Sequence, residues 1–411
     1  MTADFPNLRH MRVFLEATRA GSVSEAAARC NLSQPAATQA IAKLEDTLGA
    51  PLLLRRTREL TATAEGQVFA ARVATALDRL ASASRAARRL GGGSRGAFDT
   101  QVTAAQLRAL VAIAETGSFT VAARALDLSQ PTVHRTARNL EAIAGVPLFT
   151  ATAAGVGLTA AAQVFVQGVK LAQAEIRQGL AELTQLRGQE SASFVIGSLP
   201  LARTRIVPDA VHRMVTDAPG MQIRVVEGRY SELLRSLREG DLDCMIGALR
   251  NPVPADDVVQ EKLFDDPLCI VAHPSHPLAQ RCHVTVEDTL AYPWVAPPKE
   301  TPAGQYLYET LRIQDRPETP VRVVASSLVF LRGLLAHGDC VSIISRHQIS
   351  VEEADGHLVP LPIPLENNAR AIGLTFRRDW RPTESQARFI EFLRMQTGTA
   401  DGASAAAEDR Q

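Results

Sequence analysis

Side chains suited to reading DNA recur in one short stretch near the start of the chain, between positions 33 and 58. Its first part holds hydroxyl and amide groups, Ser33, Gln34, Thr38 and Gln39, which can hydrogen-bond to base edges. Its second part is basic, with three arginines between positions 55 and 58 that can meet backbone phosphates. The chemistry indicated is recognition of a nucleic acid without a covalent step.

Two short helices must hold these groups in place. Ser22 is placed to cap the first helix, with Glu25 three positions on to complete a capping box, and Ser33 is placed to cap the second. Asn31-Leu32 makes the turn between them, and Pro35 falls in the first turn of the second helix, where a missing N–H costs nothing. The pattern predicts a helix-turn-helix. A structural helical hairpin with no DNA role is the alternative that these residues alone leave open.

The residues around this motif resemble the DNA-binding domain of LysR-type transcriptional regulators. The resemblance is carried by Leu8-Arg9-His10-Met11-Arg12-Val13-Phe14, Gly21-Ser22, Ala26-Ala27, Leu32-Ser33-Gln34-Pro35-Ala36, Leu44-Glu45, Leu48-Gly49, Leu52-Leu53 and Arg55-Arg56. It implies a winged helix-turn-helix over 7–63, in which a strand at 52–54 leads into a basic loop. It assigns DNA contact to Ser33, Gln34, Pro35, Ala36, Thr38, Gln39, Lys43, Arg55, Arg56 and Arg58.

The same motif occurs a second time, 96 positions later and without a gap. The residues that match the first copy are Gly117-Ser118, Ala122-Ala123, Leu128-Ser129-Gln130-Pro131, Leu140-Glu141, Gly145, Pro147-Leu148, Thr159 and Gln163-Val164-Phe165. A register of that length indicates an internal repeat. We therefore predict a second winged helix-turn-helix over 102–159, whereas the family pattern has one.

The second copy distributes its charges differently from the first. Its candidate DNA contacts are Ser129, Gln130, Thr132, His134, Arg135 and Arg138, so its second helix is basic. Its wing, over 150–155, is neutral. Two interpretations stay open. Either both copies touch DNA by different surfaces, or the second copy serves mainly packing and dimerisation.

A long apolar stripe follows each copy. Residues at helical spacing from Phe69 to Leu80 predict a linker helix that begins at Ala64 and ends in a glycine run, so 64–96 is expected to be a linker helix with a flexible hinge. The stripe from Phe165 to Leu183 predicts a second such helix over 161–188. This second helix either packs on its own domain or pairs with its counterpart in another subunit.

Length and charge indicate a multidomain protein with a basic N-terminal part. Of the 411 residues, 1–95 hold 14 Lys and Arg against 8 Asp and Glu, whereas those beyond 190 hold 23 against 29. No apolar run reaches the length of a membrane span, and no signal-peptide core precedes the first motif, so a cytoplasmic protein is expected. The five scattered cysteines favour reduced thiols over a redox-sensing pair.

From Ser193 the pattern changes to short β-rich runs that alternate with helical stretches. Strands are expected at 194–197, 223–227, 242–247, 268–272, 294–296, 321–325, 341–344 and 371–376, which implies parallel sheets flanked by helices. Pieces of this region resemble the effector domain of LysR-type regulators, namely Pro208, Leu233-Leu234, Leu237, Glu239-Gly240-Asp241-Leu242-Asp243, His276-Pro277-Leu278-Ala279 and Gly338-Asp339-Cys340-Val341. The resemblance implies an effector-binding domain over 193–396 with two α/β lobes, like a type 2 periplasmic binding protein. One lobe spans 193–266 and 368–396, the other 267–367, and a disordered tail follows over 397–411.

Ligands of open α/β lobes bind at the carboxyl ends of strands, near helix N-termini. This rule selects eight candidate effector-binding residues: Ser198, Leu199, Thr204, Arg229, Tyr230, Thr301, Ser326 and Ser327. The two serines at 326 and 327 are equally suited to be plain helix caps, and Arg229 is the candidate charge partner. Together they describe a small polar ligand with carboxylate or hydroxyl groups. Within the family, the effector half resembles regulators of sugar or aromatic-acid metabolism, which implies a sugar, a sugar acid or an aromatic acid as the ligand.

Other chemistries find no support in the sequence. His273 and His276 stand in a proline-broken loop without Cys, Asp or Glu ligands nearby, so we expect neither a metal nor a cofactor. Nothing resembles a catalytic triad, a P-loop or a GxGxxG turn.

The sequence therefore predicts a ligand-responsive transcriptional regulator and not an enzyme. Its expected partners are a promoter operator on double-stranded DNA, a small-molecule effector and further copies of itself in a dimer or tetramer, with RNA polymerase as another candidate. The alternative is a small-molecule binding protein or a dehydratase-like enzyme on the same two-lobed fold. The doubled helix-turn-helix argues against that alternative.

Overall fold

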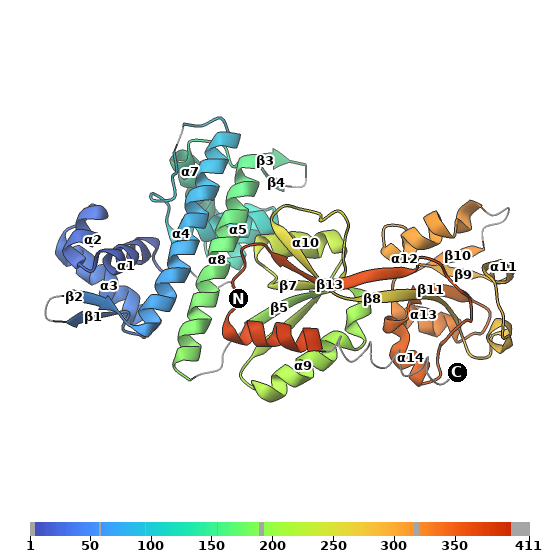
Figure 1. Cartoon of the computed structure of the whole chain (residues 1–411). Coiled ribbons are helices and arrows are strands. Elements are labelled where there is room, and N and C mark those ends of the chain that lie inside the picture. The colour runs from blue at the N-terminus through green and yellow to red at the C-terminus, as the bar shows by residue number, and fades with distance from the viewer. Residues whose placement is uncertain are drawn as a thin grey trace. The chain divides into compact units, whose positions relative to one another are not determined.

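The chain forms two compact units in this computed structural model, which describes residues 5–56, 59–94, 96–153, 155–188, 193–315 and 320–395 (Figure 1). Unit 1 comprises 1–192 together with 239–241, and unit 2 comprises the remainder. The tail predicted over 397–411 lies outside the described residues. None of the helices within them is both long enough and apolar enough to cross a membrane.

Unit 1 begins with a helix-turn-helix and a wing, here named copy 1. Its elements are α1 (Leu8–Ala20), α2 (Val23–Arg29), α3 (Gln34–Leu48) and the antiparallel strands β1 (Leu53–Arg56) and β2 (Glu59–Ala62). Ser22 and Ser33 cap α2 and α3 as predicted, and Asn31 takes the left-handed conformation (φ 54°) in the turn. The expected reciprocal capping bond of Glu25 is replaced by an ion pair, because its carboxylate binds Arg29 one turn along the same helix at 2.5 Å.

The same elements recur as copy 2, with every boundary 96 positions higher. They are α5 (Ala104–Thr116), α6 (Phe119–Ala125), α7 (Gln130–Ala144), β3 (Phe149–Thr152) and β4 (Gly155–Leu158). Ser118 and Ser129 cap α6 and α7, and Asp127 repeats the left-handed turn (φ 54°) of Asn31. Identical caps at identical spacing explain why the two segments take the same local structure.

Each copy continues into a long helix, α4 (Ala64–Leu90) after copy 1 and α8 (Ala160–Leu186) after copy 2, and the two helices pack along each other (Figure 1). Small residues allow the close approach, since a Cβ added at Gly168 would lie only 2.2 Å from the Cβ of Ala83. The second long helix packs on α4 of the same chain, a partner that neither sequence-based alternative named, and it also contacts α5 and β4 of its own copy. Pairing with a counterpart in another subunit stays a prediction.

The glycine run after α4 is a packed turn where we expected a flexible hinge. Cβ atoms at Gly91 and Gly93 would lie 2.6 and 2.7 Å from side-chain atoms of Val146, in the loop after α7. The Arg88 guanidinium donates to the carbonyls of Ile143 and Ala144 at the end of α7, at 2.9 Å each. The glycines are therefore needed for close contact with copy 2 more than for freedom of motion.

Unit 2 is built on a mixed sheet with strand order β10-β9-β11-β8-β13-β7-β5-β6, with β12 beside β8. The strands are β5 (Ser193–Ser198), β6 (Gln222–Glu227), β7 (Cys244–Ala248), β8 (Val258–Ala272), β9 (Trp294–Ala296), β10 (Val321–Val324), β11 (Val341–Ser345), β12 (Val359–Pro360) and β13 (Ala369–Arg377). Parallel pairing is confined to β5, β6 and β7 in the first lobe and to β9, β10 and β11 in the second. The expectation of wholly parallel sheets is wrong, because β8 and β13 run antiparallel to their neighbours. These two strands cross between the lobes, and β8 changes partner from β13 to β11 after Pro267.

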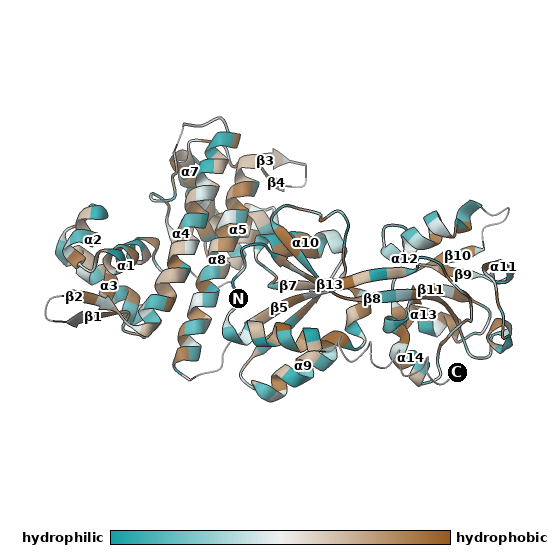
Figure 2. Ribbon diagram, in the orientation of Figure 1, coloured by the Kyte–Doolittle hydropathy of each residue, from teal (hydrophilic) through white to brown (hydrophobic). Residues whose placement is uncertain are grey.

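Helices flank the sheet of each lobe, and Figure 2 shows them with apolar and polar residues interspersed. The first lobe has α9 (Ile206–Asp217), α10 (Tyr230–Glu239) and a helix over 384–395; the second has α11 (Val286–Thr289), α12 (Pro302–Gln305), α13 (Leu328–Leu335) and α14 (Ser350–Ala354). Single turns complete them: η1 (Pro200–Arg203), η2 (Pro277–Gln280), η3 (Tyr306–Thr310), η4 (Ile313–Asp315) and η5 (His347–Ile349). Fully buried Phe194 and Phe389 anchor the first core, with ring centroids 4.7 Å apart, and Trp294 anchors the second.

Candidate functional site

Helix α3 of copy 1 presents its predicted DNA contacts to solvent. Ser33, Gln34, Pro35, Thr38, Gln39 and Lys43 are exposed, and Ala36 is half-buried. The opposite face of α3 is buried, with Ala37, Ala40 and Ile41 packed against α1 and α2. The i, i+4 spacing of Gln34 and Thr38 places both on the exposed face, where they can reach a groove of DNA.

A carboxylate fixes the wing to this helix. Glu45 Oε1 accepts hydrogen bonds from the backbone N–H groups of Leu52 (2.7 Å) and Leu53 (3.1 Å), which begin the wing. In copy 2, Glu141 makes the same pair of bonds to Leu148 (2.8 Å) and Phe149 (3.1 Å). The sequence signal was the Leu-Glu pair shared by both copies, but its role as the bond between recognition helix and wing was missed.

The basic residues of the wing lie partly within the strand. Arg55 and Arg56 close β1, where the sequence placed them in a loop. The position of Arg58, with the turn of the wing, is outside the described residues.

Helix α7 of copy 2 is less basic on its surface than its sequence suggests. Ser129, Gln130, Arg135 and Arg138 are exposed, and Arg138 pairs with Glu141 at 2.6 Å. His134 is half-buried, with its ring edge-on to Phe119 at 5.1 Å between centroids, so part of its ring packs against α6. Thr132 is half-buried beside the helix cap Ser129. Arg135 is the cation of this helix best placed to reach DNA.

In unit 2 the strand-end residues of the first lobe share one edge of the sheet, because β5, β6 and β7 run parallel. Ser198 at the end of β5 is fully buried, and Leu199 is half-buried. Thr204 Oγ1 donates to the carbonyl of Gln348, just after β11, at 3.0 Å. This bond joins the strand-end edges of the two lobes.

Arg229 does not have the surroundings of a buried charge partner. It is exposed, and its backbone N–H donates to Glu232 Oε2. Half-buried Arg250, two residues beyond β7, lies instead over the ring of Tyr230 at 4.4 Å. Burial, together with the nearby charge of Arg370, lowers the pKa of the Arg250 guanidinium. The strand-end rule would have found Arg250 if it had also been applied to β7.

In the second lobe two of the candidates are helix caps. Thr301 Oγ1 accepts from Gly304 N–H at 3.1 Å, and Ser327 Oγ accepts from Phe330 N–H at 3.3 Å. Ser326 is exposed and precedes that cap. The capping role that the sequence left open is thus confirmed for Ser327, and it leaves Ser326 the freer hydroxyl.

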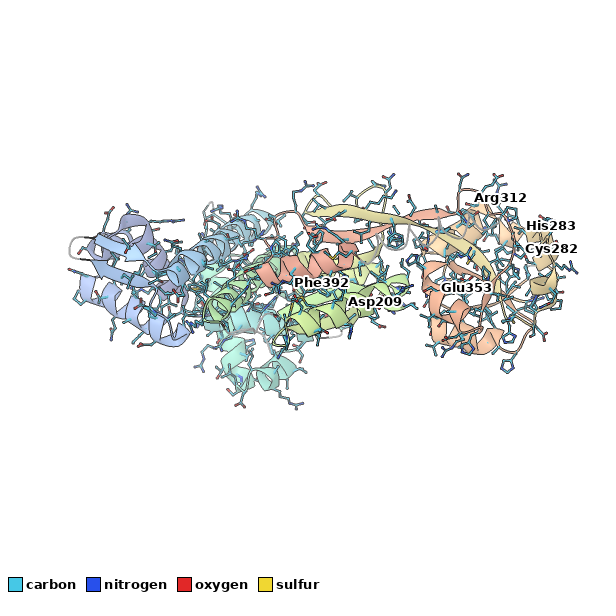
Figure 3. The ribbon with its side chains drawn as sticks, turned by 60° about the horizontal axis from the view of Figure 1, so that its bottom comes forward. Asp209, Cys282, His283, Arg312, Glu353 and Phe392 are labelled. Carbon is cyan, nitrogen blue, oxygen red and sulfur yellow. The ribbon has the colours of Figure 1, made fainter. Side chains whose placement is uncertain are left out.

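The five cysteines are free thiols. Burial raises the pKa of Cys244 strongly and that of Cys269 to about 12, which disfavours the reactive thiolate at both. Cys282 is exposed, beside His283 on the second lobe (Figure 3). Within the described ranges no cluster of His, Cys, Asp or Glu could hold a metal ion, and buried His276 accepts from Leu278 N–H at 3.1 Å.

An exposed recognition helix on a winged helix-turn-helix, joined in one chain to a two-lobed ligand-binding fold, defines a ligand-responsive DNA-binding regulator. The family described as "Bacterial regulatory helix-turn-helix protein, lysR family" matches residues 8–67 and again 104–163. The family "LysR substrate binding domain" matches residues 187–398. The chain belongs to the LysR family of bacterial transcriptional regulators.

Proteins similar to this chain support the family assignment. The HTH-type transcriptional regulator GalR of Pseudomonas putida is 33% identical over 377 residues, which cover 91% of this chain and 93% of the relative. PcaQ of Agrobacterium fabrum is 27% identical over 73% of this chain and 96% of its own length, so this chain holds a stretch that PcaQ lacks. A full-length OxyR variant from Pseudomonas aeruginosa, 23% identical, has the same fold, with a TM-score of 0.51 over 70% of this chain and 92% of that one.

These comparisons confirm the predicted fold class, a helix-turn-helix part followed by a two-lobed effector domain. They also confirm transcriptional regulation over the enzyme alternative, since the relatives are named as regulators. LysR regulators bind DNA and small-molecule effectors and form oligomers, as predicted for this chain.

Proposed function

We propose that this regulator carries a duplicated DNA-reading domain, with winged helix-turn-helix copies over 7–63 and 102–159 ahead of an effector-binding domain over 193–396. The observation that carries the proposal is the constant offset of 96 positions between every helix and strand of copy 1 and copy 2. The offset extends to side-chain chemistry, because Glu45 and Glu141 make the same two bonds to the wing. An offset shared by boundaries, caps and buried bonds is expected of a duplication and not of two unrelated helical hairpins.

Both copies are proposed to touch DNA, each with its own chemistry. Copy 1 offers the neutral amides and hydroxyls of α3 and the arginines of its wing. Copy 2 offers a neutral wing and the exposed Arg135 and Arg138 on α7. Arginine is well suited to bidentate contact with guanine and to phosphate binding.

Replacing Arg135 and Arg138 of copy 2 together by Ala is expected to weaken binding of the intact protein to its operator at least about tenfold, because removing one base or phosphate contact costs on the order of 1–3 kcal/mol. The measurement is a duplex titration by fluorescence anisotropy at fixed salt. The matched control removes the same charge from unit 2 through Arg378→Ala and Arg388→Ala, both at exposed positions. Unchanged affinity in the α7 variant would make copy 2 a structural element.

The effector is proposed to be a small organic acid held between the strand-end edges of the two lobes. Arg250 and Tyr230 supply a cation and an aromatic face in the first lobe, beside Ser198, Leu199 and Thr204. Thr301, Ser326 and Ser327 supply hydroxyls in the second. A half-buried guanidinium that stacks on an aromatic ring favours a carboxylate over a neutral sugar, since burial makes its charge costly without an anion. Closure of the lobes on the ligand would shift how subunits of the oligomer sit on the operator.

An aromatic acid or a sugar acid is expected to raise the midpoint of thermal unfolding of the intact protein, whereas the matched neutral sugars leave it unchanged. At a ligand concentration about 100 times the Kd, the stabilisation is about 2.7 kcal/mol. Arg250→Gln should abolish the shift, and Arg229→Gln, at the exposed position, should retain it. Stabilisation by neutral sugars alone, or an unchanged shift in Arg250→Gln, would contradict the proposal.

A further inference from the structure

The two long helices of unit 1 are related to each other by a pseudo-two-fold axis. They run antiparallel: Arg72 of α4 lies against Gly179 of α8, where an added Cβ would be 3.1 Å from the Cβ of Arg72, and Ala83 lies against Gly168. With the offset of 96, position 168 corresponds to 72 and position 179 to 83. The contact of position 72 with position 179 therefore becomes the contact of position 168 with position 83 when the two helices exchange places, as a two-fold axis requires.

The ends of the helix pair follow the same symmetry. Arg88 near the end of α4 donates to carbonyls at the end of α7, and Arg187 after α8 donates to the carbonyl of Leu48 at the end of α3, at 2.9 Å. Each long helix thus ends against the recognition helix of the other copy, and the copies lie at opposite ends of the pair. Helices of 27 residues span about 40 Å. That length is close to the roughly 34–36 Å between half-sites one turn of DNA apart.

Charge breaks this symmetry at the centre of the pair. Arg79 and Glu175 occupy equivalent positions, and they face each other with 3.9 Å between Arg79 Nη2 and Glu175 Oε1. Arg72 is buried and donates to Glu182 at 3.0 and 2.5 Å, to Glu175 at 3.1 Å and to Gln178 at 2.8 Å. Burial opposes the charge of Arg72, but the hydrogen bonds that it donates to Glu182 and Glu175 outweigh burial and raise the pKa of Arg72.

If α4 paired with α4 of another chain, or α8 with α8, all of these ion pairs and hydrogen bonds would be lost. An α4–α4 pair would set Arg79 against Arg79 and would bury Arg72 against Ala86 and Ser82, the equivalents of Glu182 and Gln178. An α8–α8 pair would set Glu175 against Glu175 and would leave Glu182 facing Gly168. A buried charge without a partner is strongly destabilising. The side chains at these positions therefore favour the pairing of α4 with α8 over an α4–α4 pair and over an α8–α8 pair.

The connection between the copies places both helices in one chain. Leu90 ends α4 and Ala104 begins α5, and the turn between them packs Gly91 and Gly93 on Val146 of copy 2. Copy 2 is thereby fixed at the C-terminal end of α4, and α8, which starts from copy 2, runs back along α4. The geometry is that of a helical hairpin with one copy at each end.

We infer that a single chain is a complete reader of two DNA half-sites, and that these half-sites differ in sequence because the recognition helices α3 and α7 differ. Gln34 and Gln130 are the same residue at equivalent positions, but Ala36, Gln39 and Lys43 in α3 stand where α7 has Thr132, Arg135 and Asn139. This inference rests on the proposed function, in which both copies touch DNA. It adds to that function that the operator is asymmetric and is read by each chain alone.

The test begins with selection of binding sequences from a random duplex library by the intact protein. A selected duplex trimmed to one pair of half-sites is then titrated against the protein, and the bound ratio is measured by sedimentation velocity at two wavelengths. The expected result is one duplex per chain, whatever the size of the oligomer, on a pair of unlike half-sites. One duplex per two chains, or a selected pair of like half-sites, would overturn the inference and leave the proposed regulator standing.

A variant of α7 makes the test sharper. Thr132→Ala, His134→Thr, Arg135→Gln, Arg138→Ala and Asn139→Lys give α7 the α3 residue at every position equivalent to 34–43 that is exposed or half-buried in α3. Its selected duplex is expected to become an inverted repeat of two like half-sites, still at one duplex per chain. An unaltered selected sequence would overturn the inference. If no sequence is enriched by the unaltered protein, the proposed function fails together with it.

Discussion

Replacing Arg72 by Met is expected to lower the free energy of unfolding of unit 1 by about 3–5 kcal/mol, the magnitude typical of a buried ion pair that is deprived of one partner. Methionine keeps the aliphatic stem that packs on Gly179, so the loss of stability comes from the removed charge. Without the guanidinium, Glu175 stays buried, with Arg79 its remaining cation at 3.9 Å, and Glu182 loses two hydrogen bonds. Chemical denaturation of the intact protein, followed by helical circular dichroism, measures the change.

Two further variants separate the charge from simple loss of packing. Arg85→Met, on the exposed face of the same helix, should change stability by no more than about 0.5 kcal/mol. Adding Glu175→Gln and Glu182→Gln to Arg72→Met should recover most of the loss, because the two side chains that Arg72 pairs with are then neutral and need no counter-ion. If the triple variant is less stable than Arg72→Met alone, the cluster is not held by its charges.

Replacing Arg55, Arg56 and Arg58 together by Ala is expected to weaken binding to every duplex alike. Removing one phosphate contact lowers the slope of log affinity against log salt by about 0.9, so the slope should fall by up to about 2.7. Anisotropy titrations between about 50 and 200 mM salt measure the slope on an operator and on an unrelated duplex. The control triple variant, Arg224→Ala with Arg378→Ala and Arg388→Ala in unit 2, removes the same charge from exposed positions and should keep the slope.

Replacing Gln34 or Thr38 by Ala should act differently, because amides and hydroxyls on the exposed face of α3 meet base edges. The expected loss is about 1–3 kcal/mol on the operator, with preference relaxed at one base pair and the salt slope unchanged. Two results would contradict these roles. One is a wing variant that loses affinity for the operator alone, and the other is a Gln34 variant that loses affinity equally for all duplexes.

The sequence predicted the local structure of unit 1 well because that structure depends on residues that lie close together in the chain. Serine caps, the left-handed turn residues and the glycines after helices act within a few positions of each other, and they recur 96 residues apart. Glu45 was visible only as part of a motif. Its bonds to the amides of Leu52 and Leu53 depend on how the wing folds back on α3, which spacing alone does not show.

What the sequence could not show were contacts between distant segments. The apolar stripe of α8 is compatible with several partners, and only the fold identifies α4 and the match of Arg72 with Glu175 and Glu182. The first half of β8 was missed because charged residues such as Glu261 and Lys262 interrupt its apolar pattern, and β13 pairs with it across the sheet. Arg250 was missed because the residues after the end of β7 were not included among the strand-end candidates.

The account as a whole depends on recognition of DNA through phosphate contacts by the N-terminal copies. The most direct test is the affinity of the intact protein for its selected duplex as the salt concentration rises. We expect a log–log slope of several units together with a preference for the selected sequence over an unrelated duplex. A flat salt response without any sequence preference would contradict the account.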